Sequence, residues 1–211
     1  MAQELTHTIR SSKNKKHGMA VIKIDMSKAF DRVSWVFLFN LLGNLNFPPH
    51  WIQLVKECVT TVQYYVIVNG QTSDTFFPKC GLRQGDILSP ILFALYSEAL
   101  SSTFLHLQEI KDIKGVSIVK NDPLISHLLF ADDNYFFIHL DNKTICALSS
   151  AISTFCKDSG QIINYHKSII TFSPNTPAHI KIVSLSSLGI SSSDTFGSYL
   201  GVPLDITTNR K

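Results

Sequence analysis

Two adjacent aspartates, Asp132 and Asp133, lie inside the apolar stretch HLLFADDNYFF of residues 127–137. Apolar segments flank the polar run ADDN on both sides, which predicts a β-hairpin with the two acids at its tip. Two carboxylates that lie close together on an apolar surface repel each other and lose hydration, so a pKa rises or a cation neutralises them. Taken alone, the pair also fits a solvent-facing turn, which is the commoner arrangement.

A third carboxylate favours the interpretation that the acids bind a cation over that of a solvent-facing turn. Asp25 ends the apolar stretch AVIKID and is predicted at the end of a strand. Carboxylates at the ends of neighbouring strands can share two Mg²⁺ ions about 4 Å apart, which activate a hydroxyl nucleophile and stabilise a leaving pyrophosphate. Carboxylate oxygens are the ligands that Mg²⁺ prefers.

Composition sets broad limits on the kind of protein. The chain has 211 residues, 45% of them hydrophobic, and a mean hydropathy of +0.13, which is typical of one globular domain. The net charge of +3 permits a nucleic-acid partner without arguing for one, and the basic run RSSKNKK favours a solvated loop over a phosphate-binding or nuclear-localisation segment. The cysteines lack zinc or redox spacing and indicate reduced thiols of an intracellular protein; no signal peptide and no membrane span are expected.

The first half of the chain predicts a strand, two helices and a hairpin. Residues 19–25 form an apolar, β-branched run, and a helix follows for which Asp31 is a plausible N-cap. A second helix opens at Pro48-Pro49. Asn69-Gly70 is a strong signal for a tight β-hairpin.

The second half predicts a helix, a strand, the acidic hairpin, another helix and a last strand. Ser89 is the expected N-cap of the first helix, with Pro90 at its first position. Residues 115–119 and 168–173 are expected strands, and Gly160 is expected to end a helix that starts near residue 143. Strands and helices mix without a regular βαβ repeat, so the predicted fold class is α+β.

Five stretches occur in a fixed order: AVIKIDMSKAFDRVSW, GLRQGDILSPILF, HLLFADD, SGQIINYHKS and YLGVPL. They closely resemble the successive palm motifs of reverse transcriptases of plant non-LTR (LINE-type) retrotransposons, from about Gly18 to Leu204. The resemblance implies a right-hand polymerase palm, an antiparallel sheet backed by helices, which extends a DNA primer on an RNA template with dNTPs. It also implies two Mg²⁺ ions, for which Mn²⁺ can substitute.

The resemblance assigns roles to individual positions. Asp25, Asp132 and Asp133 resemble the catalytic metal-site acids, joined by the backbone carbonyl of Met26, and Lys167 resembles the lysine proposed to protonate the leaving pyrophosphate. The implied nucleotide-binding residues are Met26, Phe30, Arg83, Gln84 and Gly85, with Phe30 as the steric gate against a ribose 2′-hydroxyl. The implied primer grip consists of Tyr199, Leu200 and Gly201.

Several of these positions have plainer interpretations. Phe30 also fits a core aromatic, Arg83 and Gln84 fit ordinary polar loop residues, and Lys167 fits a solvated lysine. Gly85 has a physical case of its own, because a glycine before a helix lets the backbone approach a ligand closely. Asp31 and Asp86 are expected to do structural work, as a cap and in a loop bond. Ile87 and the Asn134-Tyr135 pair depart from the usual pattern without touching the metal ligands.

The resemblance also suggests a division of the chain: a basic N-terminal segment left over from the fingers (1–18), the palm (19–204) and a short tail (205–211). The fingers, thumb and endonuclease regions of a longer element are expected to be missing, so weak polymerase activity is expected. A palm remnant that binds nucleic acid without catalysis is the alternative, while a nucleotide cyclase is disfavoured because it needs neither RQGD nor YLGVPL. Nuclear location follows from the resemblance only.

Overall fold

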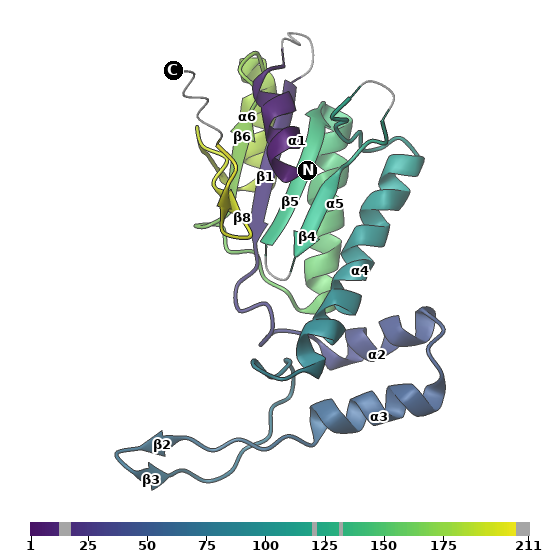
Figure 1. Ribbon diagram of the computed structural model, residues 1–211, viewed down its shortest axis with the longest axis vertical. Coiled ribbons are helices and arrows are strands. Elements are labelled where there is room, and N and C mark those ends of the chain that lie inside the picture. Colours follow the sequence, from purple (N-terminus) through teal and green to yellow (C-terminus); the bar gives the residue numbers. More distant parts are fainter. Residues whose placement is uncertain (13–17, 120–121, 131–132, 206–211) are drawn as a thin grey trace.

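The computed structural model describes residues 1–12, 18–119, 122–130 and 133–205, and its centre is a five-stranded sheet (Figure 1). The strand order is β4-β5-β1-β6-β7, and every pairing is antiparallel except β6 with β7. The strands are β1 (Gly18–Asp25), β4 (His127–Phe130), β5 (Asp133–Leu140), β6 (Ile169–Phe172) and β7 (Ser191–Ser192). The α+β class is confirmed, and the parallel edge pairing makes the sheet mixed rather than wholly antiparallel.

The two faces of this sheet pack against different parts of the chain. Ala20, Ile22 and Ile24 point to one face, where α4 (Leu88–Glu109), α5 (Asn142–Ser159) and α6 (Ala178–Leu188) supply most of the core. Met19 and Val21 point to the other face and pack with α1 (Ala2–Arg10) and the segment around 196–204. Because side chains alternate along a strand, β1 takes part in both cores.

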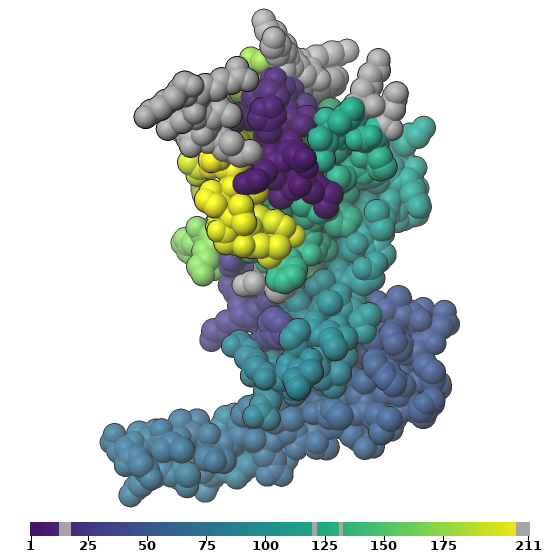
Figure 2. All heavy atoms as spheres, viewed as in Figure 1, coloured from purple at the N-terminus to yellow at the C-terminus, as the bar shows by residue number. Residues whose placement is uncertain are grey.

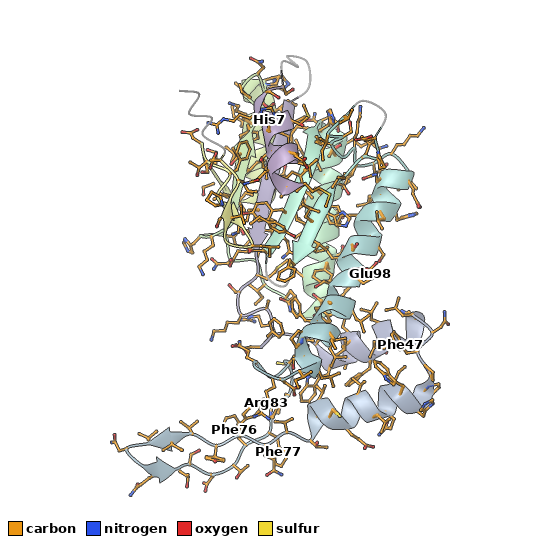
Figure 3. All side chains as sticks on the ribbon, viewed as in Figure 1. His7, Phe47, Phe76, Phe77, Arg83 and Glu98 are labelled. Atoms are coloured by element: carbon orange, nitrogen blue, oxygen red, sulfur yellow. The ribbon has the colours of Figure 1, made fainter. Side chains whose placement is uncertain are left out.

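Below the sheet in Figure 1 lie α2 (Trp35–Asn44), α3 (Pro49–Thr60) and an arm that projects from the body, residues 62–78. The arm ends in the hairpin of β2 (Ile67–Val68) and β3 (Gln71–Thr72). Asn69 and Gly70 both have positive φ, 51° and 79°, as a tight hairpin turn requires. The predicted hairpin is therefore confirmed. Phe76 and Phe77 near its base are largely exposed (Figure 3).

Two predicted helix caps are wrong. Ser34, not Asp31, caps α2, since its hydroxyl accepts a hydrogen bond from the amide of Phe37 at 3.3 Å. At α4, the helix already begins at Leu88, so Ser89 lies inside the first turn. The carboxylate of Asp86 accepts the amide of Leu88 at 2.8 Å, which confirms the loop bond expected of Asp86.

Three further features differ from the predicted elements. Residues 115–119 form only isolated bridges, Gly115 with Ile138 and Val116 with Ile125, rather than a strand. The helices α1 and α6 were not predicted. The sequence predicts residues 1–18 as a separate basic segment, yet Leu5 and Ile9 of α1 are fully buried against the sheet.

The predicted end of α5 at Gly160 is confirmed, with φ at 80°.

The helix α4 is longer and more apolar than expected. By length and composition alone, with a mean hydropathy of 1.2 over its apolar window, it is long and apolar enough to cross a membrane. A core helix passes the same test. Several α4 side chains are buried in the core: Ser89, Leu92, Phe93, Tyr96, Leu100 and Phe104.

Candidate active site

Asp25 and Asp133 are direct cross-strand partners, at the end of β1 and the start of β5. Strand alternation places both on the same face as Lys23 and Tyr135, which are also partners in this register. This is the face turned away from α4 and α5. The sheet thus brings two of the three predicted carboxylates together. The third, Asp132, lies outside the described residues.

The backbone of Asp25 is fixed by the loop 161–168. Its amide donates to the hydroxyl of Ser168 at 3.0 Å, and its carbonyl accepts the amide of Asn164 at 2.8 Å. Met26 forms an isolated bridge with Ile163, and its side chain is buried. These bonds continue β1 past its last strand residue, so Asp25 sits on a rigid support.

The same loop carries Lys167, whose amide donates to the carbonyl of Asn164 at 3.1 Å. Its side chain is exposed, and no ion pair of Lys167 is found among the described residues. The structure therefore brings the backbone of the Lys167 loop to Asp25. The predicted proton-donor role of Lys167 stays a prediction.

Lys23 supplies a cation that the sequence-based prediction missed. Its ammonium nitrogen lies 2.9 Å from Oδ1 of Asp133 and 5.4 Å from the centre of the Tyr135 ring. Burial lowers the pKa of Lys23, but the hydrogen bond to Asp133 and the charges of Tyr135 and Asp133 outweigh burial, so the net shift of the pKa is upward. The spacing of two between Lys23 and Asp25 on one strand is the sequence signal that could have revealed it.

Phe30 and the loop 80–86 form a second part of the candidate site. Phe30 is half-buried and stacks on Phe93, with ring centroids 4.5 Å apart. Its carbonyl accepts the amide of Leu82 at 2.8 Å. Gly81 has φ of 93°, and a Cβ there would lie 2.7 Å from the carbonyl oxygen of Asp31, so only glycine allows this close contact. The sequence-based prediction named Gly85 but missed Gly81.

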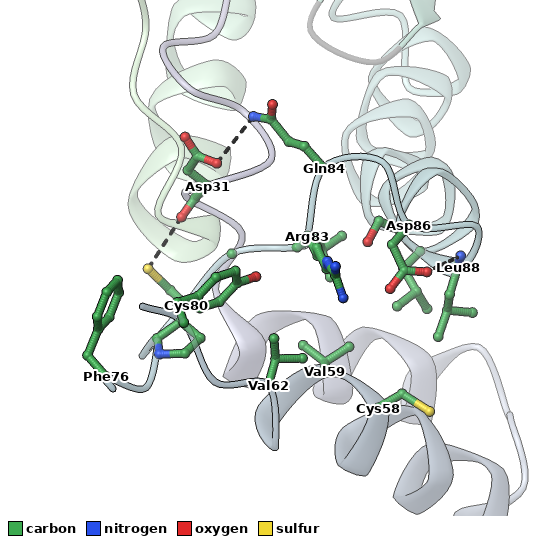
Figure 4. Close-up of a pocket in the computed structure, with 16 residues that line it drawn as sticks. Asp31, Cys58, Val59, Val62, Phe76, Cys80, Arg83, Gln84, Asp86 and Leu88 are labelled. Atoms are coloured by element: carbon green, nitrogen blue, oxygen red, sulfur yellow. Dashed lines mark hydrogen bonds between the residues drawn. The ribbon is translucent and has the colours of Figure 1, made fainter. Parts of the chain in front are cut away.

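The predicted nucleotide-contacting residues follow in this loop, next to a cavity of about 580 Å³ (Figure 4). Gln84 donates to the carboxylate of Asp31 at 3.3 Å, and the exposed Arg83 lines the cavity together with Val59 and Val62 of α3 and the segment after it. Gly85 has φ of 82°, and no atom lies within 4 Å of where its Cβ would stand. The backbone at Gly85 is therefore open to approach from outside.

The predicted primer grip forms a small hairpin of β8 (Ser198–Tyr199) and β9 (Val202–Pro203), with Leu200 and Gly201 at the turn. It lies on the carboxylate face of the sheet. The ring of Tyr199 meets that of Tyr135 edge to face, with centroids 5.3 Å apart. Burial and the negative charge of Asp133 raise the pKa of Tyr199, so hairpin and carboxylates are within electrostatic reach of each other.

The helix α1 holds this hairpin from outside. Gln3 donates to the carbonyl of Pro203 at 3.0 Å, and Thr6 donates to the carbonyl of Leu204 at 3.2 Å. Arg10 pairs with Asp205 at 3.2 Å. Figure 2 shows the N-terminal helix, in purple, beside the segment that leads to Asp205, in yellow. The N-terminal segment thus supports the hairpin that the sequence assigns to the primer.

The carboxylate oxygens of Asp25 and Asp133 are of the kind that a divalent cation prefers, and the two residues are cross-strand partners where the strands end. Within the described ranges, no group of three His, Cys, Asp or Glu side chains lies close enough to hold a metal ion. The described part therefore contains two of the three predicted carboxylate ligands, together with Met26, and the metal site itself is a proposal.

The comparisons with known proteins agree with this architecture. The family model described as reverse transcriptase (RNA-dependent DNA polymerase) matches residues 1–204. An uncharacterized mitochondrial protein of Arabidopsis thaliana is 48% identical over 67 residues, covering 32% of this chain and 55% of that protein. The Pol polyprotein of the type-1 retrotransposable element R2 of Popillia japonica is 24% identical over 165 residues, covering 77% of this chain and 26% of the polyprotein.

Among solved structures, apo telomerase from Candida Tropicalis, truncated from its C-terminal domain, superposes with a TM-score of 0.59 at 22% identity. The match covers 82% of this chain and 35% of the telomerase chain, and at this identity it shows the fold alone. The chain spans about half of the Arabidopsis protein and a quarter of the Popillia polyprotein. The expected kinship with retrotransposon reverse transcriptases is confirmed, and the chain belongs to the reverse transcriptase (RNA-dependent DNA polymerase) family.

Proposed function

We propose that this chain is the catalytic core of an RNA-directed DNA polymerase that extends the 3′-hydroxyl of a primer with dNTPs on an RNA template. The observation that carries the proposal is the cross-strand pairing of Asp25 with Asp133 on the face of the sheet that is turned away from α4 and α5. Family membership supports the reaction type, and a solved telomerase of similar fold, described in complex with a fragment of telomeric RNA, is consistent with an RNA template.

In this proposal Asp25, Asp133 and Asp132 hold two Mg²⁺ ions, with the carbonyl of Met26 as a further ligand. When bound, the ions supply charge stabilisation for phosphoryl transfer and lower the pKa of the attacking hydroxyl. Asp25 holds its position through its backbone bonds to Asn164 and Ser168. Catalysis of this kind depends on such positioning as much as on charge.

The other predicted residues then have separate tasks. The 80–86 loop presents Arg83, Gln84 and the open backbone of Gly85 to the incoming nucleotide. Phe30, held by its stack on Phe93, is proposed as the steric gate that the sequence resemblance implies. Lys167 is proposed to protonate the leaving pyrophosphate, and the 198–203 hairpin, tied to β5, is proposed to hold the primer end.

Divalent-cation binding is tested first, because it does not depend on polymerase activity. Mn²⁺ or Mg²⁺ is expected to raise the melting temperature of the purified chain by mass action. Asp25→Asn is expected to remove most of this gain. Asp86→Asn is the matched control, since Asn keeps the oxygen that accepts the amide of Leu88, and its gain should equal that of the wild type. Equal gains in all three proteins would reject the metal assignment.

Polymerase activity is then measured by primer extension on an RNA template at low salt, with this chain and with one extended by flanking sequence to the length of its relatives. We expect extension to require Asp25 and to tolerate Asp86→Asn. Metal binding without extension by either protein would favour the alternative from the sequence, a palm that binds nucleic acid and performs no catalysis.

A further inference from the structure

Lys23 is placed by the same strand pairing that places the carboxylates. It lies two residues before Asp25 on β1, so both side chains leave the same face of the sheet. Its direct cross-strand partner is Tyr135, and Asp133 is its diagonal neighbour on β5. A lysine side chain spans this diagonal, and its ammonium group reaches Oδ1 of Asp133 at 2.9 Å.

The ion pair between Lys23 and Asp133 reduces the repulsion between the carboxylates of Asp25 and Asp133. Like charges directly opposite each other in an antiparallel pair destabilise the sheet, and Asp25 and Asp133 are in that position. Lys23 and Asp133 side chains are 20% and 29% exposed, so their attraction is screened less than that of a surface pair. One positive charge therefore partly offsets the repulsion without any bound metal.

The position of Lys23 is also restricted. Its ammonium group lies over the ring of Tyr135, which is fully buried and whose hydroxyl is bonded to the 198–203 hairpin. Packing on this ring limits the rotamers open to Lys23. A fixed ammonium group in turn limits where the Asp133 carboxylate can point.

We propose that Lys23 is a positioning residue of the metal site: it acts as a built-in counter-ion that holds the Asp133 carboxylate before divalent cations bind and lowers the affinity of the site for them. The inference rests on the proposed function, in which Asp133 is a metal ligand. A cation that enters the site meets the positive charge of Lys23, so the same residue stabilises the metal-free fold and opposes metal binding.

Loss of the Lys23 charge should lower the stability of the metal-free protein but raise its affinity for divalent cations. A purely structural role of Lys23 would not raise the affinity. Lys23→Met keeps the length and apolar stem of the side chain but removes the charge. In EDTA it is expected to lower the melting temperature by roughly 2–4 °C, and much less in the Asp133→Asn background. The affinity for Mn²⁺, measured by electron paramagnetic resonance, is expected to rise by roughly tenfold. Lys23→Arg keeps the charge and should leave both quantities near those of the wild type.

The control is Lys143→Met, which breaks the ion pair of Lys143 with Asp112 at 2.6 Å far from the carboxylates along the sheet. It should leave Mn²⁺ affinity unchanged. An unchanged or lower Mn²⁺ affinity in Lys23→Met, or an equal temperature loss with and without Asp133, would overturn the inference. If Asp25→Asn abolishes Mn²⁺ binding while Lys23→Met changes nothing, the inference alone fails. If the wild type and Lys23→Met both bind no Mn²⁺, the proposed function fails with it.

Discussion

The hydroxyl of Tyr135 donates a hydrogen bond of 2.8 Å to the carbonyl oxygen of Ser198. Tyr135 lies two residues after Asp133 on β5, and Ser198 begins the hairpin that the sequence assigns to the primer. The bond therefore joins the strand that carries a predicted metal ligand to the hairpin proposed to hold the primer end. Because Tyr135 is fully buried, its geometry is fixed by the packing around it.

Tyr135→Phe removes this bond and keeps the ring. We expect a loss of about 1 kcal/mol in the free energy of unfolding, the usual value for one hydrogen bond, measured by urea denaturation. Primer–template affinity should fall as well, because the hairpin loses its tie to β5. Tyr199→Phe is the control for stability, since no hydrogen bond of the Tyr199 hydroxyl is found among the described residues. An equal free energy of unfolding in the two variants would show that the bond does not hold the hairpin.

Local signals in the sequence predicted much of the fold. Asn69-Gly70 and Gly160 require left-handed backbone, and Pro49 opens a helix, so each marks its element without knowledge of tertiary structure. The helix α1 lacks such signals, whereas α6 ends at the left-handed Gly189, with φ of 66°, a signal that the sequence-based prediction missed. α6 reads AHIKIVSLSSL and places a serine, the fully buried Ser184, at a position that faces the core. The position of α6 depends on its packing against α5, a tertiary contact that cannot be predicted from the local sequence.

In the candidate site, too, the sequence revealed the residues that carry a local signal and missed those that depend on tertiary contacts. Asp25 could be recognised because it ends an apolar strand, and the five ordered motifs supplied the loop and the hairpin. Lys23 and Tyr135 were missed because they meet only through the pairing of β1 with β5. This pairing joins residues that are more than a hundred positions apart in the sequence. Gly81 was missed for a similar reason, because the atom that excludes a side chain there belongs to Asp31, fifty positions earlier in the chain.

Phe30→Val tests the predicted steric gate. Truncation removes the stack on Phe93 and should cost roughly 1–3 kcal/mol of stability. If the ring blocks a ribose 2′-hydroxyl, ribonucleotides should be incorporated more readily, with a smaller loss of deoxyribonucleotide use, in single-nucleotide primer extension. Phe93→Leu disrupts the same stack but leaves the Phe30 ring in place, so sugar discrimination should persist. Unchanged discrimination in a folded Phe30→Val protein would make Phe30 a core aromatic, the alternative from the sequence.

The buried thiol of Cys156 is expected to make the free energy of unfolding fall at alkaline pH. Burial raises the pKa of its thiol from 9.0 to about 11. The folded state holds this proton more tightly than the unfolded state, so the stabilisation is complete below pH 9 and is lost as the pH rises from 9 to 11. Cys156→Ala should therefore lose less stability than the wild type between pH 8 and pH 10, measured by urea denaturation. Cys146→Ala, which removes an exposed thiol, should follow the wild type. Parallel curves for all three proteins would contradict the assignment.

The two glycines of the 80–86 loop differ in what surrounds them. Both have positive φ, 93° at Gly81 and 82° at Gly85, so alanine is strained at either position. At Gly81 the new Cβ would also lie 2.7 Å from the carbonyl oxygen of Asp31. The loop is held there by two bonds, from the Gly81 amide to Val33 at 2.9 Å and from the Trp35 indole to the Gly81 carbonyl at 2.7 Å.

Alanine at these positions should therefore separate support of the loop from contact with the nucleotide. Gly81→Ala combines strain with a collision and is expected to cost more than about 2 kcal/mol in urea denaturation, because the loop or the Asp31 turn must move. Gly85→Ala meets no neighbouring atom and should cost only about 1 kcal/mol. Its effect should instead fall on dNTP affinity in the presence of Mg²⁺, since a methyl group would stand where the backbone is proposed to approach the nucleotide. Full dNTP affinity in a stable Gly85→Ala protein would remove Gly85 from the nucleotide site and leave it a plain loop glycine.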